Sequence, residues 1–212
     1  MKYIDLTMTY RSGMRGVDIE PAKTLQKDGW NASNLQIYSH AGTHMDAPVH
    51  FEVNEKTIDH YPISRFFCDC WVVDILECKP SQLIGLADMG DIANQVSPGE
   101  GLLFRTGWSA FAAEEKYRNE LPRISQGLAR WCAEKGIALI GVEPPSVADV
   151  NNQNELIQVH TILLKADILI IEGLCNLDQI SQPKVKLIAL PLKISDGDGA
   201  PCRVIAIENI AK

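Results

Sequence analysis

The chain has 212 residues, of which 46% are hydrophobic, and its formal net charge at pH 7 is −7. This length and apolar content are typical of one globular domain with a sizeable core. The acidic balance, without a basic run, argues against nucleic acid or an anionic membrane as a partner. No apolar stretch approaches a membrane span and no export signal is evident, so we expect a cytoplasmic protein whose six cysteines are reduced.

The first thirty residues predict a short strand followed by an arm. Residues 3–8 alternate between polar and apolar side chains, as a strand does. Residues 10–29 contain three glycines, a proline and several charges, with little apolar periodicity. We therefore expect an irregular arm or loop within residues 1–30. Such a segment could form the wall of a pocket or lie on plain surface, and the sequence leaves both open.

Residues 34–38 alternate again and lead into a stretch rich in metal-ligating side chains. Residues 39–51 read Ser-His-Ala-Gly-Thr-His-Met-Asp-Ala-Pro-Val-His-Phe and hold three of the five histidines. Imidazole and carboxylate groups are the usual ligands of zinc and similar divalent ions. The stretch therefore predicts most of a metal centre, with a chance cluster as the alternative.

The spacing of His40, His44, Asp46 and His50 requires a curled chain. In a helix the two leading histidines would share a face, but the other two residues would point elsewhere. In a strand all four would share a face, yet ten residues at about 3.3 Å each would separate the outer pair by about 33 Å. Metal–ligand bonds are only about 2 Å long. We expect a strand end that enters a tight loop, bent at the intervening glycine and proline.

The rest of the chain predicts alternating strands and helices, because apolar β-rich runs follow segments with helical apolar spacing. This order indicates an α/β fold, with a mixed sheet and flanking helices, in one domain over residues 1–212. Ser81 is a candidate N-cap for the first helix. We expect strands over residues 66–76, 101–108, 137–142, 168–174, 185–192 and 202–207, and helices over 81–96, 122–135 and 154–166.

Two further polar residues lie in apolar surroundings. His160 lies beside the apolar stripe of its helix, where a lone histidine is more often structural than a ligand. Glu172 follows the apolar residues 168–171, where an unpaired carboxylate is costly to bury. It needs a cation, a metal or solvent, and an exposed strand end is the alternative. Residues 196–199, Asp-Gly-Asp-Gly, predict a turn before the last strand rather than a calcium loop.

Residues 40–50 resemble the signature of the metal-dependent cyclase family, which includes bacterial kynurenine formamidases and isatin hydrolases. The family pattern is H-x-G-T-H-x-D-x-P-x-H, and every specified position matches. The resemblance implies a swivelling β/β/α architecture and one or two divalent ions, Zn²⁺ or Mn²⁺. A downstream histidine and glutamate twelve positions apart would hold the second ion, to which Asp46 would bridge. By resemblance the metal ligands are His40, His44, Asp46, His160 and Glu172, and the general acid/base is His50.

This resemblance implies a metal-dependent hydrolase that opens an amide, formamide or lactam C–N bond, as an arylformamidase does. A divalent ion activates water near neutral pH and polarises a carbonyl. His50 could protonate the leaving group, because its unperturbed pKa is near 6.5. The alternatives are an isatin hydrolase-like, lactone-acting or cyclising enzyme, and a non-catalytic metal-binding protein. The acid/base histidine favours an enzyme, because a structural site has no use for it.

The substrate pocket and the assembly are less specified. The formamidases carry a Trp-Pro-Gly-type segment near the N-terminus, whereas residues 10–16 here read Tyr-Arg-Ser-Gly-Met-Arg-Gly. Tyr10 could form an aromatic wall, and Arg11 and Arg15 could receive a substrate carboxylate or be solvated surface. Trp108 is a second candidate for the wall, with core packing as the alternative. The expected partner is a small-molecule carbonyl substrate, and the family resemblance implies a homodimer or homotetramer.

Overall fold

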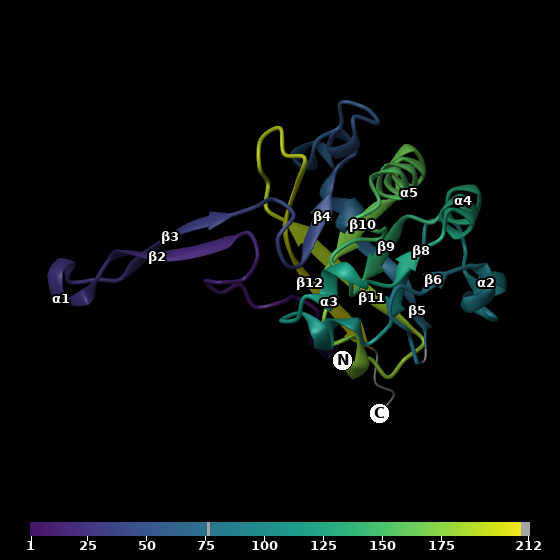
Figure 1. Ribbon diagram of the computed structural model, residues 1–212, viewed down its shortest axis with the longest axis horizontal. Coiled ribbons are helices and arrows are strands. Elements are labelled where there is room, and N and C mark those ends of the chain that lie inside the picture. Colours follow the sequence, from purple (N-terminus) through teal and green to yellow (C-terminus); the bar gives the residue numbers. More distant parts are fainter. Residues whose placement is uncertain (76, 209–212) are drawn as a thin grey trace.

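The computed structural model describes residues 1–75 and 77–208 (Figure 1). Its main sheet has eight strands in the order β1-β12-β11-β5-β7-β9-β10-β4, and β4 also pairs with β12. The sheet therefore closes on itself through β4. Its strands are β1 Lys2–Asp5, β4 His44–Asp46, β5 Phe67–Asp74, β7 Gly101–Arg105, β9 Leu139–Val142, β10 Leu169–Glu172, β11 Lys184–Pro191 and β12 Gly199–Glu208.

The sheet is mixed, as predicted. Strands β5, β7, β9 and β10 run parallel to one another, whereas β4, β11 and β12 join antiparallel to their neighbours. Strands β7, β9 and β10 are buried on both faces, which explains their nearly continuous apolar sequences. Along β7, Leu103 belongs to the core enclosed by the strands, while Leu102 and Phe104 face the core under the helices.

Two helices cover one face of the sheet beside β9 and β10 (Figure 1). Helix α4, Gln126–Lys135, begins at Ser125, whose hydroxyl accepts the Leu128 N–H, and ends at Gly136 with a left-handed φ of 74°. Helix α5, Gln153–Lys165, packs beside it. The remaining helices are short: α1 Leu25–Asp28, α2 Ile92–Gln95, α3 Lys116–Asn119, and 3₁₀-helices at Pro48–Phe51, Ile58–His60, Ile63–Phe66, Leu86–Met89, Trp108–Phe111 and Leu177–Gln179.

The prediction of an irregular arm or loop over residues 10–29 is wrong in one respect, because residues 17–28 form a regular strand and a short helix. Strands β2, Val17–Lys23, and β3, Ala32–Ile37, form an antiparallel hairpin with α1 at its tip, and the hairpin projects away from the main sheet (Figure 1). Both strands are largely exposed, so no apolar face marks β2 in the sequence, whereas the alternation of residues 34–38 did indicate β3.

The predicted helix over residues 81–96 is also wrong. The segment contains β6, Leu83–Ile84, which pairs in parallel with β8, Arg123–Ile124, before a 3₁₀-helix and α2. Ser81 has a φ of 56° and caps no helix, and Gly90, with a φ of 51°, interrupts the segment. The helix predicted from residue 122 begins later because β8 occupies its first residues. Residue 76, at the end of a predicted strand, lies outside the described residues.

None of the helices in the described part of the chain combines the length and the apolar character needed to cross a membrane.

Candidate metal centre and active site

The histidine-rich stretch is curled in the way its spacing requires. After β3 the chain turns at residues 39–43, enters β4 between β10 and β12, and continues into the 3₁₀-helix that begins at Pro48. The order of the parts differs from the expectation, because the turn precedes the strand and the helix follows it. The result is that side chains ten residues apart converge on one site.

The turn is fixed by close backbone packing against the end of β10. Gly173 has a φ of 68°, and a Cβ atom there would lie 2.2 Å from the Gly42 carbonyl oxygen. The Thr43 hydroxyl donates to the Gly173 carbonyl at 2.5 Å and accepts the Met8 N–H at 2.8 Å. The glycine after Glu172 is thus required for the turn to approach the strand.

Tyr10 holds the same turn instead of forming a wall of the pocket. Its hydroxyl lies 2.7 Å from the Ala41 carbonyl oxygen and 2.8 Å from that of Thr43, and donates to this pair. Burial raises the pKa of the Tyr10 phenol, which keeps it a donor. The predicted role of Tyr10 in substrate binding is therefore replaced by a role in positioning the turn.

The structure brings the five predicted ligands into one buried cluster. His44 comes from β4, next to Asp46 on the same strand, and its Nε2 lies 3.5 Å from the Asp46 Oδ1 and 3.2 Å from the Glu172 Oε2. His160, on α5, places its Nε2 3.3 Å from the Glu172 Oε1 and 3.6 Å from the Asp46 Oδ2. His40 Nδ1 lies 2.9 Å from the Asp46 Oδ1. Both carboxylates thus lie between histidines.

The Nδ1 atoms of His44 and His160 determine which nitrogen of each ring carries the proton. Nδ1 of His44 lies 3.0 Å from the Gly42 carbonyl oxygen, and Nδ1 of His160 lies 2.7 Å from that of Leu156. A carbonyl accepts only, so each Nδ1 carries the proton and each neutral ring turns an Nε2 lone pair towards the carboxylates. Lone pairs and carboxylate oxygens repel unless a proton or a cation lies between them. The arrangement therefore demands one or the other.

Unpaired buried atoms favour the cation. In the described part of the chain the buried His44 Nε2 and Asp46 Oδ2 make no hydrogen bond of good geometry, although the Glu172 Oε2 and the His160 Nε2 lie 3.2 and 3.6 Å from them. Leaving such groups unsatisfied costs about 1–3 kcal/mol each. Ligand atoms of His40, His44 and Asp46 lie within 4.8 Å of one another, as do those of Asp46, His160 and Glu172. The residues present fit one or two divalent ions with nitrogen and oxygen ligands.

The ionisation of the cluster follows from burial and its paired charges. Burial opposes the charge on His40, but Asp46 and Asp198 outweigh it and raise the pKa of His40 to about 9. The same balance raises the pKa of His44 and of His160, where Glu172 is the main partner. Burial likewise opposes the Asp46 and Glu172 charges, yet the histidines lower both pKa values. Without an ion, protons hold this cluster together.

His50 lies beside the cluster but behaves differently. Its ring stacks on His40 with centroids 3.8 Å apart, and its Nδ1 lies 3.7 Å from the Asp198 Oδ2. Burial lowers the pKa of His50, and the charges of His40 and His160 act in the same direction, outweighing the opposing charges of Asp46 and Asp198. The imidazole is therefore neutral near pH 7 and can accept a proton.

Asp198 is a site residue that the sequence analysis missed. Residues 196–199 do form a turn before β12, but the Asp198 carboxylate lies 3.0 Å from the His40 Nε2. It forms a third group of potential ligands with His40 and His50. The register of β12 against β4, with Gly199 opposite Asp46, places it there. Strand pairing of this kind leaves no local signal in the sequence.

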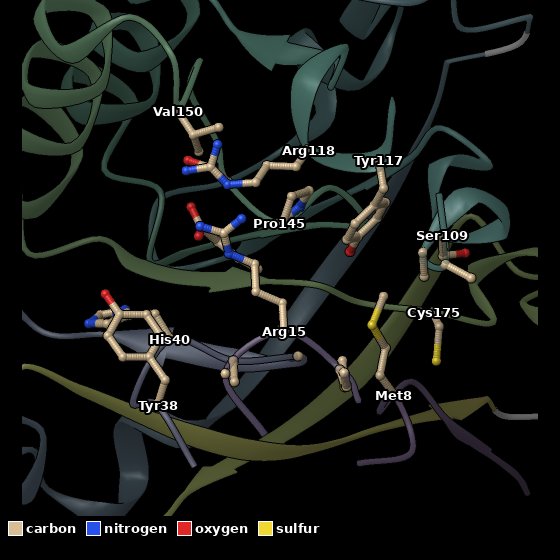
Figure 2. A pocket seen from close by; sticks show the side chains of 18 of the residues that line it. Met8, Arg15, Tyr38, His40, Ser109, Tyr117, Arg118, Pro145, Val150 and Cys175 are labelled. Atoms are coloured by element: carbon tan, nitrogen blue, oxygen red, sulfur yellow. The ribbon is translucent and has the colours of Figure 1, made fainter. Parts of the chain in front are cut away.

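A cavity of about 1340 Å³ opens onto this site, with His40, His50, His160 and Glu172 among its lining residues. Met8 and Arg15, from the segment before β2, line one side, and Ser109, Tyr117 and Arg118 line another (Figure 2). Trp108 does not line it: the indole is 2% exposed and donates to the Tyr117 carbonyl at 2.9 Å. The predicted pocket wall at Trp108 is therefore wrong, and Tyr117 takes that place, its hydroxyl donating to the Glu143 carbonyl at 2.7 Å.

Comparisons with known proteins agree with the motif and the fold. Residues 4–149 match the model of the family described as "Putative cyclase". The kynurenine formamidase of Erythrobacter litoralis is 33% identical over 84% of this chain and 77% of the relative, and that of Bacillus thuringiensis subsp. konkukian is 32% identical over 82% and 79%.

Solved structures share the architecture over nearly the whole chain. Isatin hydrolase A from Labrenzia aggregata, bound to benzyl benzoate, gives a TM-score of 0.86 at 23% identity, covering 97% of this chain and 93% of that one. A protein from Bacillus stearothermophilus described as a predicted metal-dependent hydrolase gives a TM-score of 0.78 at 24% identity, with 97% of each chain covered. The expected cyclase-like fold is confirmed, and the chain belongs to the cyclase family.

Proposed function

We propose that this protein is a metal-dependent hydrolase that opens the C–N bond of a small amide, formamide or lactam, with an aryl formamide as the first candidate. The observation that carries the proposal is the buried ligand cluster, with its unpaired His44 Nε2 and Asp46 Oδ2, at the inner end of an open cavity. A structural metal site has no need of such a cavity.

The ligands would be His40, His44, Asp46, His160 and Glu172, with Zn²⁺ as the first choice, Mn²⁺ as the second, and one or two ions. A bound divalent ion supplies a Lewis acid and makes water nucleophilic near neutral pH. Ligands must be free of protons, so a bound ion would displace the protons that the histidines hold in its absence and leave the Nε2 atoms of His44 and His160 and the two carboxylates as ligands. The second group of ligand atoms, built on Asp46, supports a two-ion centre.

The chain's own residues would move the proton. Neutral His50 accepts a proton from the attacking water and returns it to the leaving nitrogen, which must be protonated to depart. Asp198 lies on the Nδ1 side of the His50 ring, where its carboxylate stabilises the imidazolium that forms. Phe51 stacks on His160 with centroids 4.4 Å apart and keeps that side of the cluster dry.

The relatives named kynurenine formamidase, at 30–33% identity, support formamide hydrolysis ahead of the alternatives. Lactam opening of the isatin hydrolase type, lactone opening and ring closure could use the same residues. A panel of formanilide, isatin and an aryl lactone, offered to Zn²⁺- and Mn²⁺-loaded protein, separates them. We expect formanilide to have the highest kcat/KM. If isatin alone were turned over, the assignment would change to lactam hydrolysis. If no substrate were turned over although metal was firmly bound, a non-catalytic metal-binding protein would be supported.

We also propose that the protein works as a homodimer or homotetramer. The β2–β3 hairpin pairs with no other strand of the described residues and exposes apolar side chains along its length. Trp30 is 56% exposed and Leu35 is 62% exposed, and a second copy would cover them. Sedimentation of the full chain, compared with Trp30→Ser, tests this proposal: a monomeric wild-type protein would contradict it.

A further inference from the structure

Arginines gather at the cavity although the chain carries a net charge of −7. Arg11, Arg15 and Arg118 all line it. Arg15 comes from the loop before β2 and Arg118 from α3, so two separate segments supply them. Figure 2 shows the guanidinium groups of Arg15 and Arg118 next to each other, on the same side of the cavity as His40. Two positive groups thus converge close to the candidate active site.

Neither Arg15 nor Arg118 has a carboxylate partner. Four other arginines of the described residues form ion pairs at 4.0 Å or less, and these two do not. The polar partner of Arg118 is neutral, since its Nη1 donates to the Asn151 Oδ1 at 3.2 Å. Besides Glu172 at the ligand cluster, the cavity has two acidic lining residues. Glu114 pairs with a lysine at 3.5 Å, and Glu115 accepts from an asparagine at 3.4 Å.

The proximity of the two guanidinium groups is unfavourable on its own. Burial and the charge of Arg15 lower the pKa of Arg118, with Asp149 opposing them. Like charges repel, although water at the open side of the cavity weakens the effect. An anion between the two groups would remove the repulsion. Guanidinium forks bind carboxylates by paired, charge-assisted hydrogen bonds, so a carboxylate is the anion that this geometry suits.

We propose that Arg15 and Arg118 bind a carboxylate of the substrate while its amide carbonyl lies at the ligand cluster beside His50. This inference rests on the proposed function and narrows it. The substrate class becomes a small aryl amide or formamide that carries a carboxylate. The two arginines then determine specificity, and the cluster performs the chemistry.

Matched substrates and variants test this assignment. The substrates are the ortho, meta and para isomers of formamidobenzoate, the longer formamidophenylpropanoate, and the methyl ester of each. The selectivity is the ratio of kcat/KM for the acid to that for its ester. In the metal-loaded wild-type protein we expect at least one pair to favour the acid by about tenfold or more. The four acids differ in the distance between carboxylate and formamide. The acid with the highest selectivity therefore indicates the distance between the two arginines and the ligand cluster.

The variants are Arg15→Gln and Arg118→Gln, with Arg130→Gln as the charge-matched control on the exposed face of α4. We expect either cavity variant to reduce the selectivity about tenfold to a hundredfold, mainly through KM for the acid. Arg118→Lys keeps the positive charge but loses the forked guanidinium group, so we expect it to retain part of the selectivity that Arg118→Gln loses. The control should keep the wild-type ratio.

Several results would overturn the inference, and each can be distinguished from a failure of the proposed hydrolase function. If the esters and formanilide turn over but no acid is preferred, or if the cavity variants keep the wild-type ratio, the carboxylate site is wrong while the hydrolase stands. If no substrate turns over, the hydrolase is wrong, and calorimetric titration with phenylpropanoate decides the site. Weaker binding by the cavity variants than by Arg130→Gln would support it, and equal binding would overturn it.

Discussion

At the scale of single residues, His50 differs from the histidines it adjoins. Carboxylates raise the pKa of His40, His44 and His160, whereas burial and neighbouring charges lower that of His50. The first three rings are set to hold a cation or a proton, and the fourth stays neutral near pH 7 at the edge of the cavity. This division is what the proposed roles require, with His50 as the acid/base group and the other three as ligands.

Replacing His50 with alanine should separate chemistry from metal binding. We expect the variant to retain its metal and to lose about 10²–10⁴-fold in kcat, the usual range for a general acid/base. Elemental analysis and kcat for formanilide are the measurements. His60→Ala is the control, because that histidine is exposed in a turn. Loss of metal from the His50 variant would instead make His50 a ligand.

The fall in activity on the acidic side of the pH–rate profile should reflect protonation of the histidine ligands. In the metal-free protein the pKa of His40 is raised to about 9, so protons compete with metal for this ring. Lowering the pH favours the protonated rings, and activity should therefore collapse in mild acid, near pH 5 to 6. Added metal should move this limb to lower pH by mass action. Activity that stayed flat through this range would rule out histidine ligation.

At the scale of elements, the contact between the end of β10 and the turn before β4 determines the site. Gly173→Ala would place a methyl group 2.2 Å from the Gly42 oxygen at a positive φ. We expect it to destabilise the fold by about 1–3 kcal/mol or more, and to weaken metal binding, because the turn must move.

The matched control for that substitution is Gly127→Ala in α4. A Cβ atom there meets only the Ser125 hydroxyl at 3.9 Å, and alanine favours a helix by up to about 1 kcal/mol. Urea unfolding of both variants measures the difference. If Gly173→Ala were as stable as Gly127→Ala, the close approach would not be what fixes the turn.

Elements were predictable where burial marks them in the sequence. The buried strands β7, β9 and β10 and the amphipathic helices α4 and α5 follow from apolar periodicity, with ends shifted by a few residues. Alternation indicated β3, but β2 and β6 were not predicted, because an exposed strand and a two-residue strand carry no apolar pattern. The motif predicted four of the converging residues of the site, and the family resemblance added His160 and Glu172. Asp198, Tyr117 and Arg118 were missed, because only the register of β12 and the packing of α3 bring them to the cavity.

At the scale of the whole molecule, the cluster couples folding to protons or metal. The His40 pKa of about 9 exceeds its ordinary value of 6.5, so the folded chain binds more protons than the unfolded one between these values. The stability that this provides is complete below about pH 6.5 and is lost as the pH rises through about 9. Metal-stripped protein should therefore become less stable over this window. Metal-loaded protein should not, because the ion replaces the protons.

Thermal unfolding of both forms across that window measures the effect. His40→Asn in the stripped protein should flatten the dependence, since the asparagine has no proton to lose. Equal pH dependence in the loaded and stripped forms would mean that the ion does not occupy this cluster.

The most direct test of the central claim is formanilide hydrolysis by chelator-stripped protein as Zn²⁺ or Mn²⁺ is added back. We expect no turnover in the stripped protein, and activity that rises with the added metal until the one or two sites built on Asp46 are filled. Full turnover in protein shown by elemental analysis to be metal-free would contradict the account. So would the absence of turnover at every metal loading.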